Sequence, residues 1–155
     1  QNQGQLQRNF QGYSTCHSND LIGLGMSSIS SGNDFFAQNQ KNIEDYYSAL
    51  DKGQLPVEKG LHINSDDIKR RSVIMALIGN LTFNIRDWED RFHTRFRDYF
   101  AAELPMLDKM EQDGLINISA ERINITDQGR AMLRNICIVF DQYHKPDSGL
   151  FSKII

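Results

Sequence analysis

The histidines and cysteines of this chain are its most reactive side chains, and their spacing does not gather them into a site. No two histidines are three or four residues apart, the spacing that places two imidazoles on one helix face for a metal ion. The two cysteines lie far apart, and two thiolates are too few for a Cys₄ zinc site or an iron–sulfur cluster. We predict no metal on these residues and two reduced thiols. The residues are His17, His62, His93, His144, Cys16 and Cys137.

A glycine- and serine-rich stretch follows an apolar island near the N-terminus. It contains Gly23 and Gly25, with Ser27 and Ser28 after them. The stretch has no G-x-S-x-G pattern for a nucleophilic serine and no complete G-x-G-x-x-G pattern for a dinucleotide. We therefore interpret residues 20–26 as a short buried strand and residues 27–32 as a loop, without a catalytic residue.

Helical spacing begins at about Phe35. Apolar residues at i, i+3, i+4 and i+7 predict a helix around residues 43–50 that ends at Gly53, followed by a connector over residues 53–60. Either Asn64 or Ser65 then caps a second helix. The apolar faces of these two helices are formed by Ile43, Tyr46, Tyr47 and Leu50, and by Ile68, Ile74, Leu77, Ile78 and Leu81.

The second half of the chain alternates helical patterns with one hairpin pattern. Asn84 starts a helix, and Pro105 divides the next helical segment into two short helices. Residues 115–118 and 122–125 predict a β-hairpin. Thr126 caps a last helix, whose expected inward residues are Met132, Leu133, Ile136, Cys137, Phe140 and Tyr143.

This order of elements predicts an α+β fold, mainly α, in which a strand-and-loop segment precedes a helical, winged-helix-like domain with one small β-hairpin. A winged helix suggests DNA binding, but the segment before the hairpin is acidic. Residues 97–113 hold two basic and five acidic side chains. That balance repels phosphate, so we predict no nucleic-acid binding.

The composition describes an ordinary globular chain. It has 155 residues and a net charge of −3, which fits one compact domain or two small ones. There is no apolar run of the roughly 20 residues that a membrane span needs, and no signal peptide. We expect a cytoplasmic protein without a membrane partner. Because the chain begins with Gln1 rather than Met, we also expect it to be part of something longer.

Four strings resemble one enzyme family, the oxygen-independent coproporphyrinogen III oxidases, which are radical S-adenosylmethionine (SAM) enzymes. RNFQGYST at residues 8–15 is similar to the family's RNFQGYTT, and LIGLGMSSIS at residues 21–30 is similar to LLGLGVSAIS. QNQK at residues 38–41 matches its QNQK segment. GRAMLRNIC at residues 129–137 resembles its GRLLIRNIC helix. The resemblance runs in register along the whole chain.

The resemblance implies a parent enzyme of haem biosynthesis that converts two propionates of coproporphyrinogen III to vinyl groups, giving protoporphyrinogen IX. Its cofactors are SAM and a [4Fe–4S] cluster held by a CxxxCxxC motif in an N-terminal partial (βα) barrel. This chain lacks that motif. We expect it to be the C-terminal portion, inactive alone and without a bound cofactor. Residues 1–34 would end the barrel, residues 35–60 form a helix and connector, and residues 61–155 form the winged-helix-like domain.

Three positions match the family's SAM site, namely Phe10, Gln11 and Ile29. Gln11 would offer an amide, while Phe10 and Ile29 would give apolar walls. Related haem chaperones tend to carry histidine where this chain has Ile29. The expected substrate of the parent enzyme is coproporphyrinogen III, and unpaired strand edges would let the chain alone dimerise. The alternatives are a non-catalytic winged-helix-like binding module for a protein, haem or nucleic acid, and a haem-chaperone relative.

Overall fold

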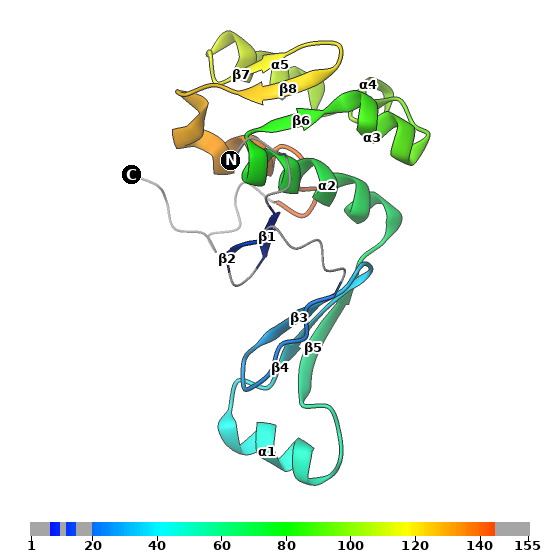
Figure 1. Ribbon diagram of the computed structural model, residues 1–155, viewed down its shortest axis with the longest axis vertical. Coiled ribbons are helices and arrows are strands. Elements are labelled where there is room, and N and C mark those ends of the chain that lie inside the picture. Colours follow the sequence, from blue (N-terminus) through cyan, green and yellow to red (C-terminus); the bar gives the residue numbers. More distant parts are fainter. Residues whose placement is uncertain (1–6, 10–11, 15–19, 145–155) are drawn as a thin grey trace. The chain divides into compact units, whose positions relative to one another are not determined.

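The computed structural model describes residues 7–9, 12–14 and 20–144, which divide into two compact units (Figure 1). Unit 1 comprises residues 1–75 and unit 2 comprises residues 76–155. Both contain helices and antiparallel sheets, so the expected α+β class is confirmed. Among the described residues, no helix is long and apolar enough to cross a membrane.

Unit 1 is built around a three-stranded antiparallel sheet. Its strand order is β3-β4-β5, and the single helix α1 follows β4 beyond one end of the sheet (Figure 1, cyan). Separately, β1 pairs with β2 in antiparallel orientation. The bounds are β1 Gln7–Asn9, β2 Gly12–Ser14, β3 Ile29–Ser31, β4 Phe35–Asn39, α1 Ile43–Asp51 and β5 Val57–His62.

The strand predicted over residues 20–26 is wrong. Only Leu21 makes a β-bridge there, to Ser31, and the strand itself is β3, within the segment predicted as loop. The apolar side chains of the island do not point inward, since Ile22 is 77% and Leu24 85% exposed. Gly23 is buried instead, so the backbone rather than the side chains packs inward here.

Two other predictions for unit 1 are corrected. The helical pattern does not begin at Phe35, because residues 35–39 form β4 and pair with β5 from Phe35 opposite His62 to Asn39 opposite Val57. The predicted connector over residues 53–60 contains most of β5. All six β5 residues are exposed, so the strand has no alternating apolar pattern that a sequence could show. The predicted helix is confirmed as α1.

Unit 2 contains most of the remaining elements. Its sheet has the order β6-β8-β7, in which β7 and β8 form the predicted hairpin and β6 is a third strand that the sequence did not predict. Pro105 lies in the first turn of α5, where a missing N–H costs nothing, so the predicted helix break is confirmed. The bounds are α2 Ser65–Asn80, which crosses the unit boundary, β6 Thr82–Asn84, α3 Ile85–Phe92, α4 Phe96–Tyr99, α5 Leu104–Gln112, β7 Ile116–Ile118, β8 Arg122–Ile125, η1 Gly129–Met132 and α6 Leu133–Ile138.

A cluster of aromatic rings forms the centre of unit 2. Trp88 meets Phe96 edge to face with ring centroids 5.7 Å apart, and Phe100 meets Phe140 in the same manner at 5.3 Å. Such arrangements stabilise a core beyond the apolar area they bury. Completely buried aliphatic residues surround the rings, namely Leu77, Leu107, Ile116, Ile123 and Ile136.

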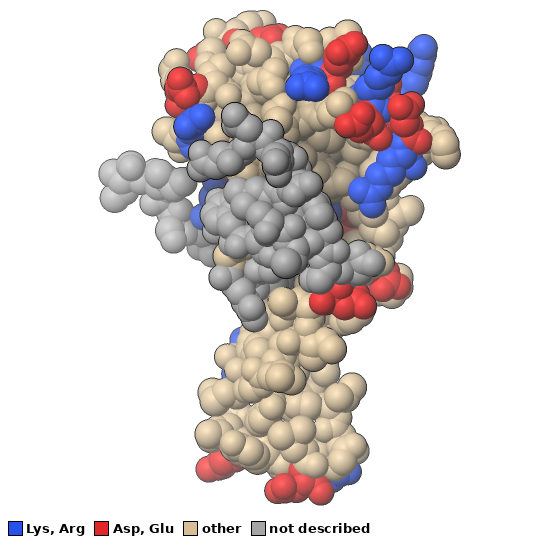
Figure 2. All heavy atoms as spheres, viewed as in Figure 1, with Lys and Arg blue, Asp and Glu red and all other residues tan. Residues whose placement is uncertain are grey.

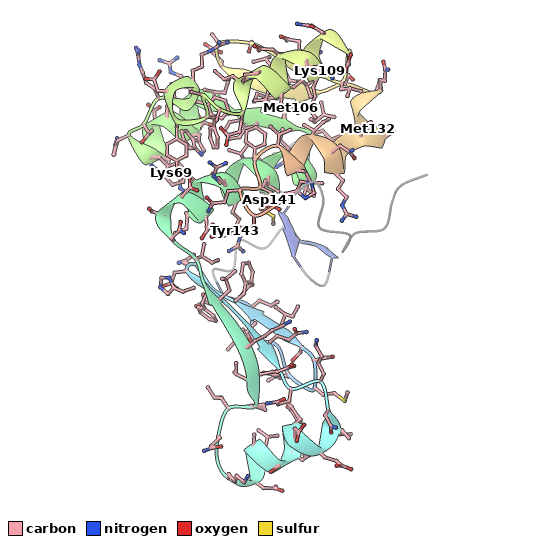
Figure 3. All side chains as sticks on the ribbon, turned by 180° about the vertical axis from the view of Figure 1, so that it is seen from behind. Lys69, Met106, Lys109, Met132, Asp141 and Tyr143 are labelled. Carbon is pink, nitrogen blue, oxygen red and sulfur yellow. The ribbon has the colours of Figure 1, made fainter. Side chains whose placement is uncertain are left out.

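The last helix is shorter than predicted. Thr126 accepts a hydrogen bond from the Gly129 N–H at 2.9 Å, but the turn that follows is the 3₁₀ helix η1, and α6 starts only at Leu133. Ile136, Cys137 and Phe140 are buried as expected. The predictions for Met132 and Tyr143 are wrong, since these side chains are exposed (labelled in Figure 3). The change from 3₁₀ to α geometry shifts the helix face that points inward.

Candidate functional site

The candidate site is the surroundings of Ile29, the described residue among the three expected to bind SAM. Ile29 is the first residue of β3, lies opposite Gln38 of β4, and is half-buried. Its partly exposed side chain fits an apolar wall for a ligand. Phe10 and Gln11 lie outside the described residues, so their expected roles stay predictions.

Residues 21–28, which we call the glycine loop, lead into Ile29 and lie along β4. Backbone hydrogen bonds attach the loop at both ends. The Leu21 N–H donates to the Ser31 carbonyl at 2.8 Å, and the Ser27 N–H donates to the Gln40 carbonyl at 2.8 Å. The Asn39 N–H also donates to the Ser28 carbonyl at 2.9 Å. The loop is thus held to the sheet although it is not a strand.

Asn39, the last residue of β4, binds the glycine loop with its side chain. The side chain is buried, with 7% of the residue exposed. Its Nδ2 lies 3.0 Å from the Gly25 carbonyl oxygen, 3.1 Å from Ser28 Oγ and 3.2 Å from the Gly23 carbonyl oxygen. Two amide hydrogens serve three acceptors. The Gly25 carbonyl also accepts from Ser28 Oγ at 2.7 Å, so Asn39 matters most to the buried contact with the Gly23 carbonyl.

Gly23 lies directly on the backbone of Ile29. A Cβ atom added to Gly23 would stand 2.8 Å from the carbonyl carbon and oxygen of Ile29, closer than side-chain atoms approach a backbone. The Gly23 N–H donates to Ser30 Oγ at 3.0 Å. This contact explains the glycine, because any larger residue would move the loop or Ile29.

Arg71 of α2 holds the turn between β3 and β4, at the end of the sheet away from Asn39. The guanidinium stacks over the ring of Phe36, 4.8 Å from its centroid, and donates to the Gly32 carbonyl at 3.4 Å. Burial of the guanidinium lowers the pKa of Arg71 below its ordinary value. A cation on an aromatic face gains attraction as it loses water, so Arg71 fixes this end of the hairpin.

Unit 1 exposes many large apolar side chains. In Figure 2, the face of the sheet region turned to the viewer is almost free of charged residues. Large exposed apolar side chains are the kind found where a protein contacts another protein region or a ligand. The exposed residues are Ile22, Leu24, Met26, Phe35, Ile43, Tyr47, Leu50, Leu55, Val57 and Leu61.

The donor groups of this chain do not fit a [4Fe–4S] cluster. The sequence has two cysteines, whereas such a cluster takes three or four thiolates. Cys137 is a free thiol buried in unit 2, and burial raises its pKa to about 11, which disfavours the thiolate. Cys16 lies outside the described residues. Within the described ranges, no three His, Cys, Asp or Glu side chains gather in a way that could hold a metal ion.

A small hollow in unit 2 is lined mostly by apolar side chains. Its walls include core residues such as Phe96 and Leu107, and its two charged residues are Arg97 and Asp108. Both charged residues belong to the acidic segment 97–113, for which we predict no nucleic-acid binding. That prediction remains untested.

The chain is similar to one family of proteins. Residues 63–132 match the HemN C-terminal domain family. The chain is similar over most or all of its length to proteins named oxygen-independent coproporphyrinogen III oxidase, and the resemblance noted in the sequence is confirmed. The relative from Pseudomonas aeruginosa is 48% identical over 92% of this chain, and that from Synechocystis is 41% identical over 100%.

A solved structure shares the fold. The coproporphyrinogen III oxidase (HemN) from Escherichia coli, described as a radical SAM enzyme, superimposes with a TM-score of 0.87 and 40% identity over 91% of this chain. This chain covers 32% of that protein. It spans about one third of the length of the two relatives named above, 31% and 34% respectively.

The sequence did not assign a role to Asn39. The residue lies in the QNQK string that carried the resemblance, but polar neighbours on both sides gave no sign that this one amide is buried. The two glycines of the loop were the available signal, since closely packed backbone needs donors nearby for its carbonyl groups.

Proposed function

We propose that this chain acts as the C-terminal part of an oxygen-independent coproporphyrinogen III oxidase (dehydrogenase). The parent reaction is the oxidative decarboxylation of two propionates of coproporphyrinogen III to vinyl groups, giving protoporphyrinogen IX. The observation that carries the proposal is similarity over 91–100% of the chain to proteins named for this activity, together with a shared fold. Ile29, where histidine would point to a haem chaperone, favours the oxidase.

SAM and a [4Fe–4S] cluster would be the cofactors of the parent enzyme, and together they supply the radical that starts the reaction. The cluster would be held outside this chain, because the chain's cysteines do not fit it. Ile29, with Phe10 and Gln11, would contribute to the wall of a SAM site. Their part is to bind and to exclude water.

We also propose the domain boundaries expected from the sequence. Residues 1–34 would complete the barrel of the parent enzyme, residues 35–60 would lead from it through β4, the helix α1 and most of β5, and residues 61–155 would form a winged-helix-like domain. The exposed apolar side chains of unit 1 support a contact with a larger domain. The antiparallel order β6-β8-β7 beside α3 and α5 supports a winged-helix-like arrangement.

A chimera tests the proposed function directly. This chain would replace the matching C-terminal region of the Pseudomonas aeruginosa relative, to which it is 48% identical. After anaerobic cluster reconstitution, we expect the chimera to form protoporphyrinogen IX from coproporphyrinogen III, detected as porphyrin fluorescence after oxidation. A chimera that folds and carries its cluster, but makes no product while the unmodified relative does, contradicts the proposal.

Ile29 tests the binding role within the same chimera. We expect Ile29→Ala, and likewise Gln11→Ala, to lower kcat/KM by about 10²-fold, because a lost wall or amide misplaces the reacting groups. Met106→Ala on the surface of unit 2 is the matched control and should leave kcat/KM unchanged. Equal product formation by Ile29→Ala and the control would remove Ile29 from the site.

The expected partners follow from the same proposal. Coproporphyrinogen III is the proposed substrate of the parent enzyme, and cytoplasmic location stays a prediction. We propose no nucleic-acid contact, which rests on the acidic balance of residues 97–113. Titration with fluorescent duplex DNA at low salt checks this, and salt-sensitive saturable binding would favour the winged-helix binding module instead.

A further inference from the structure

We propose that Asn39 is a positioning residue for Ile29, acting through the glycine loop. The inference rests on the proposed function, since that function is the reason why the place of Ile29 matters. Neither the family comparison nor the expected site residues assign a role to Asn39. Its contacts carry the argument.

The first step is that Asn39 determines the shape of the loop. Residues 21–28 form neither a strand nor a helix, apart from the single β-bridge of Leu21 to Ser31, and their turn has φ of +96° at Gly25 and +58° at Ser27. The Asn39 amide reaches across to three oxygens of the loop, from Gly23 to Ser28. Without that donor, the Gly23 carbonyl would lose the Asn39 amide in a buried place and the Gly25 carbonyl would keep Ser28 Oγ alone, so the loop would rearrange to bring the Gly23 carbonyl to water.

The second step is that the loop determines the place of Ile29. Gly23 touches the Ile29 backbone on one side, while Gln38 pairs with Ile29 in the sheet on another. The Ile29 backbone is therefore enclosed by Gly23 and by β4, the strand that also carries Asn39. A shift of Gly23 removes one of these two contacts. Asn39 thus acts on Ile29 from the buried side, without touching a ligand.

The third step is that the loop holds apolar side chains outward. Ile22 and Leu24 flank the buried Gly23 and are 77% and 85% exposed. An unsupported loop would turn such side chains inward, because apolar burial is favourable. The hydrogen bonds of Asn39 to the carbonyl groups on both sides of Leu24 oppose that collapse, so they keep the loop in the form in which Gly23 packs on Ile29.

Hydrogen exchange on this chain tests the first two steps independently of any activity. We expect Asn39→Ala to speed amide exchange at Gly23 and Ser27 by at least about tenfold, since both N–H groups bond within the region that Asn39 closes. Asn64→Ala is the matched control. It removes the same side-chain amide from a helix cap in unit 1, and its effect should stay at Asp66 and Asp67. Unchanged exchange in the glycine loop of Asn39→Ala would overturn the proposal.

Binding in the chimera tests whether Asn39 acts through Ile29. We expect Asn39→Ala to weaken the equilibrium binding of SAM and to raise its KM by about tenfold, with a smaller change in kcat. If Asn39 acts through Ile29, the double variant with Ile29→Ala should bind SAM no worse than Ile29→Ala alone. Additive losses would show an independent structural effect and overturn the proposal.

Gly23→Ala provides a second variant that keeps every side-chain donor. Its Cβ would press on the Ile29 backbone, so the SAM affinity should fall as in Asn39→Ala even if the latter folds poorly. Normal affinity in a folded Gly23→Ala protein would overturn the proposal. If the unmodified chimera itself neither binds SAM nor turns over, the proposed function fails and the role of Ile29 fails with it. The exchange data then still report on the loop, so the two failures are distinguishable.

Discussion

At the scale of single residues, Gly129 shows how closely two backbone segments approach in unit 2. A Cβ atom at this position would overlap the carbonyl oxygen of Leu115 and stand 3.2 Å from a methyl carbon of Ile125. The Gly129 N–H also donates a hydrogen bond to Thr126 Oγ1, which fixes the turn. Neither the backbone of Leu115 nor the turn can move without disturbing the hairpin that follows Leu115.

We predict that Gly129→Ala lowers the free energy of unfolding of unit 2 by about 3 kcal/mol. This value is at the upper end of the usual cost of adding a carbon atom to a well-packed site. Urea denaturation followed by the fluorescence of Trp88 measures the loss as a lower midpoint. Gly60→Ala is the control, because its Cβ would meet the Phe36 carbonyl oxygen at an ordinary 3.4 Å. A midpoint for Gly129→Ala equal to that of the unmodified chain would contradict the prediction.

Cys137 gives a prediction about pH. Burial raises the pKa of its thiol from 9.0 to about 11, so the folded chain holds this proton more tightly than the unfolded chain does. The stability that depends on the protonated Cys137 thiol is complete below pH 9 and is lost as the pH rises from 9 to 11. In a Cys16→Ser background, Cys137 should react with iodoacetamide near neutral pH only as fast as the chain unfolds.

Rapid alkylation of the folded chain would argue against a buried, protonated thiol. Cys137→Ala serves as the control in thermal melts, because it removes the titrating group. We expect its melting temperature to fall less steeply between pH 9 and 11 than that of the unmodified chain.

At the scale of elements, asparagines begin three helices. Asn42 Oδ1 accepts from the Glu44 N–H at 2.7 Å, and Asn84 Oδ1 accepts from the Asp87 N–H at 3.2 Å. Asn64 Oδ1 accepts from both Asp66 and Asp67, while Asp67 Oδ2 accepts from the Asn64 N–H at 3.0 Å. This reciprocal pair is a capping box, and it settles the choice between Asn64 and Ser65 in favour of Asn64.

We predict that Asn64→Ala lowers the free energy of unfolding by about 1 kcal/mol, the usual cost of losing such a cap. Ser65→Ala should change it by less than about 0.5 kcal/mol, because a surface substitution in the first turn loses no cap. Chemical denaturation of the two variants gives the comparison. Equal losses would mean that the two residues share the capping role.

At the scale of the whole molecule, the two units differ in where their apolar residues lie. Most of the buried apolar residues belong to unit 2; of those described, Ile63 and Val73 are the members from unit 1. Conversely, unit 1 exposes the ten large apolar residues named above, whereas the described part of unit 2 exposes Met106, Met132 and Tyr143. A unit with so little core of its own gains stability from a covering partner.

We therefore expect the chain alone to dimerise through β5, the edge strand whose residues are all exposed. The double variant Val57→Lys, Leu61→Lys should be monomeric in light scattering coupled to gel filtration, because charges oppose edge pairing. Met106→Lys with Met132→Lys makes the same chemical change on exposed residues of unit 2 and should leave the dimer intact. A monomeric unmodified chain, or equal effects of both pairs, would contradict this use of β5.

The amino-acid sequence determined those features that depend on a few neighbouring residues. The cap at Asn84, the break at Pro105 and the β7–β8 hairpin all follow from chemistry within about four residues, and the structure has each of them. The family resemblance was also readable, because it lies in contiguous strings. Ile29 lies in such a string, and its SAM role remains a prediction, as do those of Phe10 and Gln11.

Only the tertiary structure decided the sheet of unit 1 and the role of Asn39. Strand β4 was mistaken for helix and β5 for a connector, because their pairing joins residues some twenty positions apart and leaves no alternating burial in β5. Asn39 looks like any polar residue until three oxygens of the glycine loop surround its amide. Burial and hydrogen-bond partners depend on the folded chain, so local sequence does not specify them.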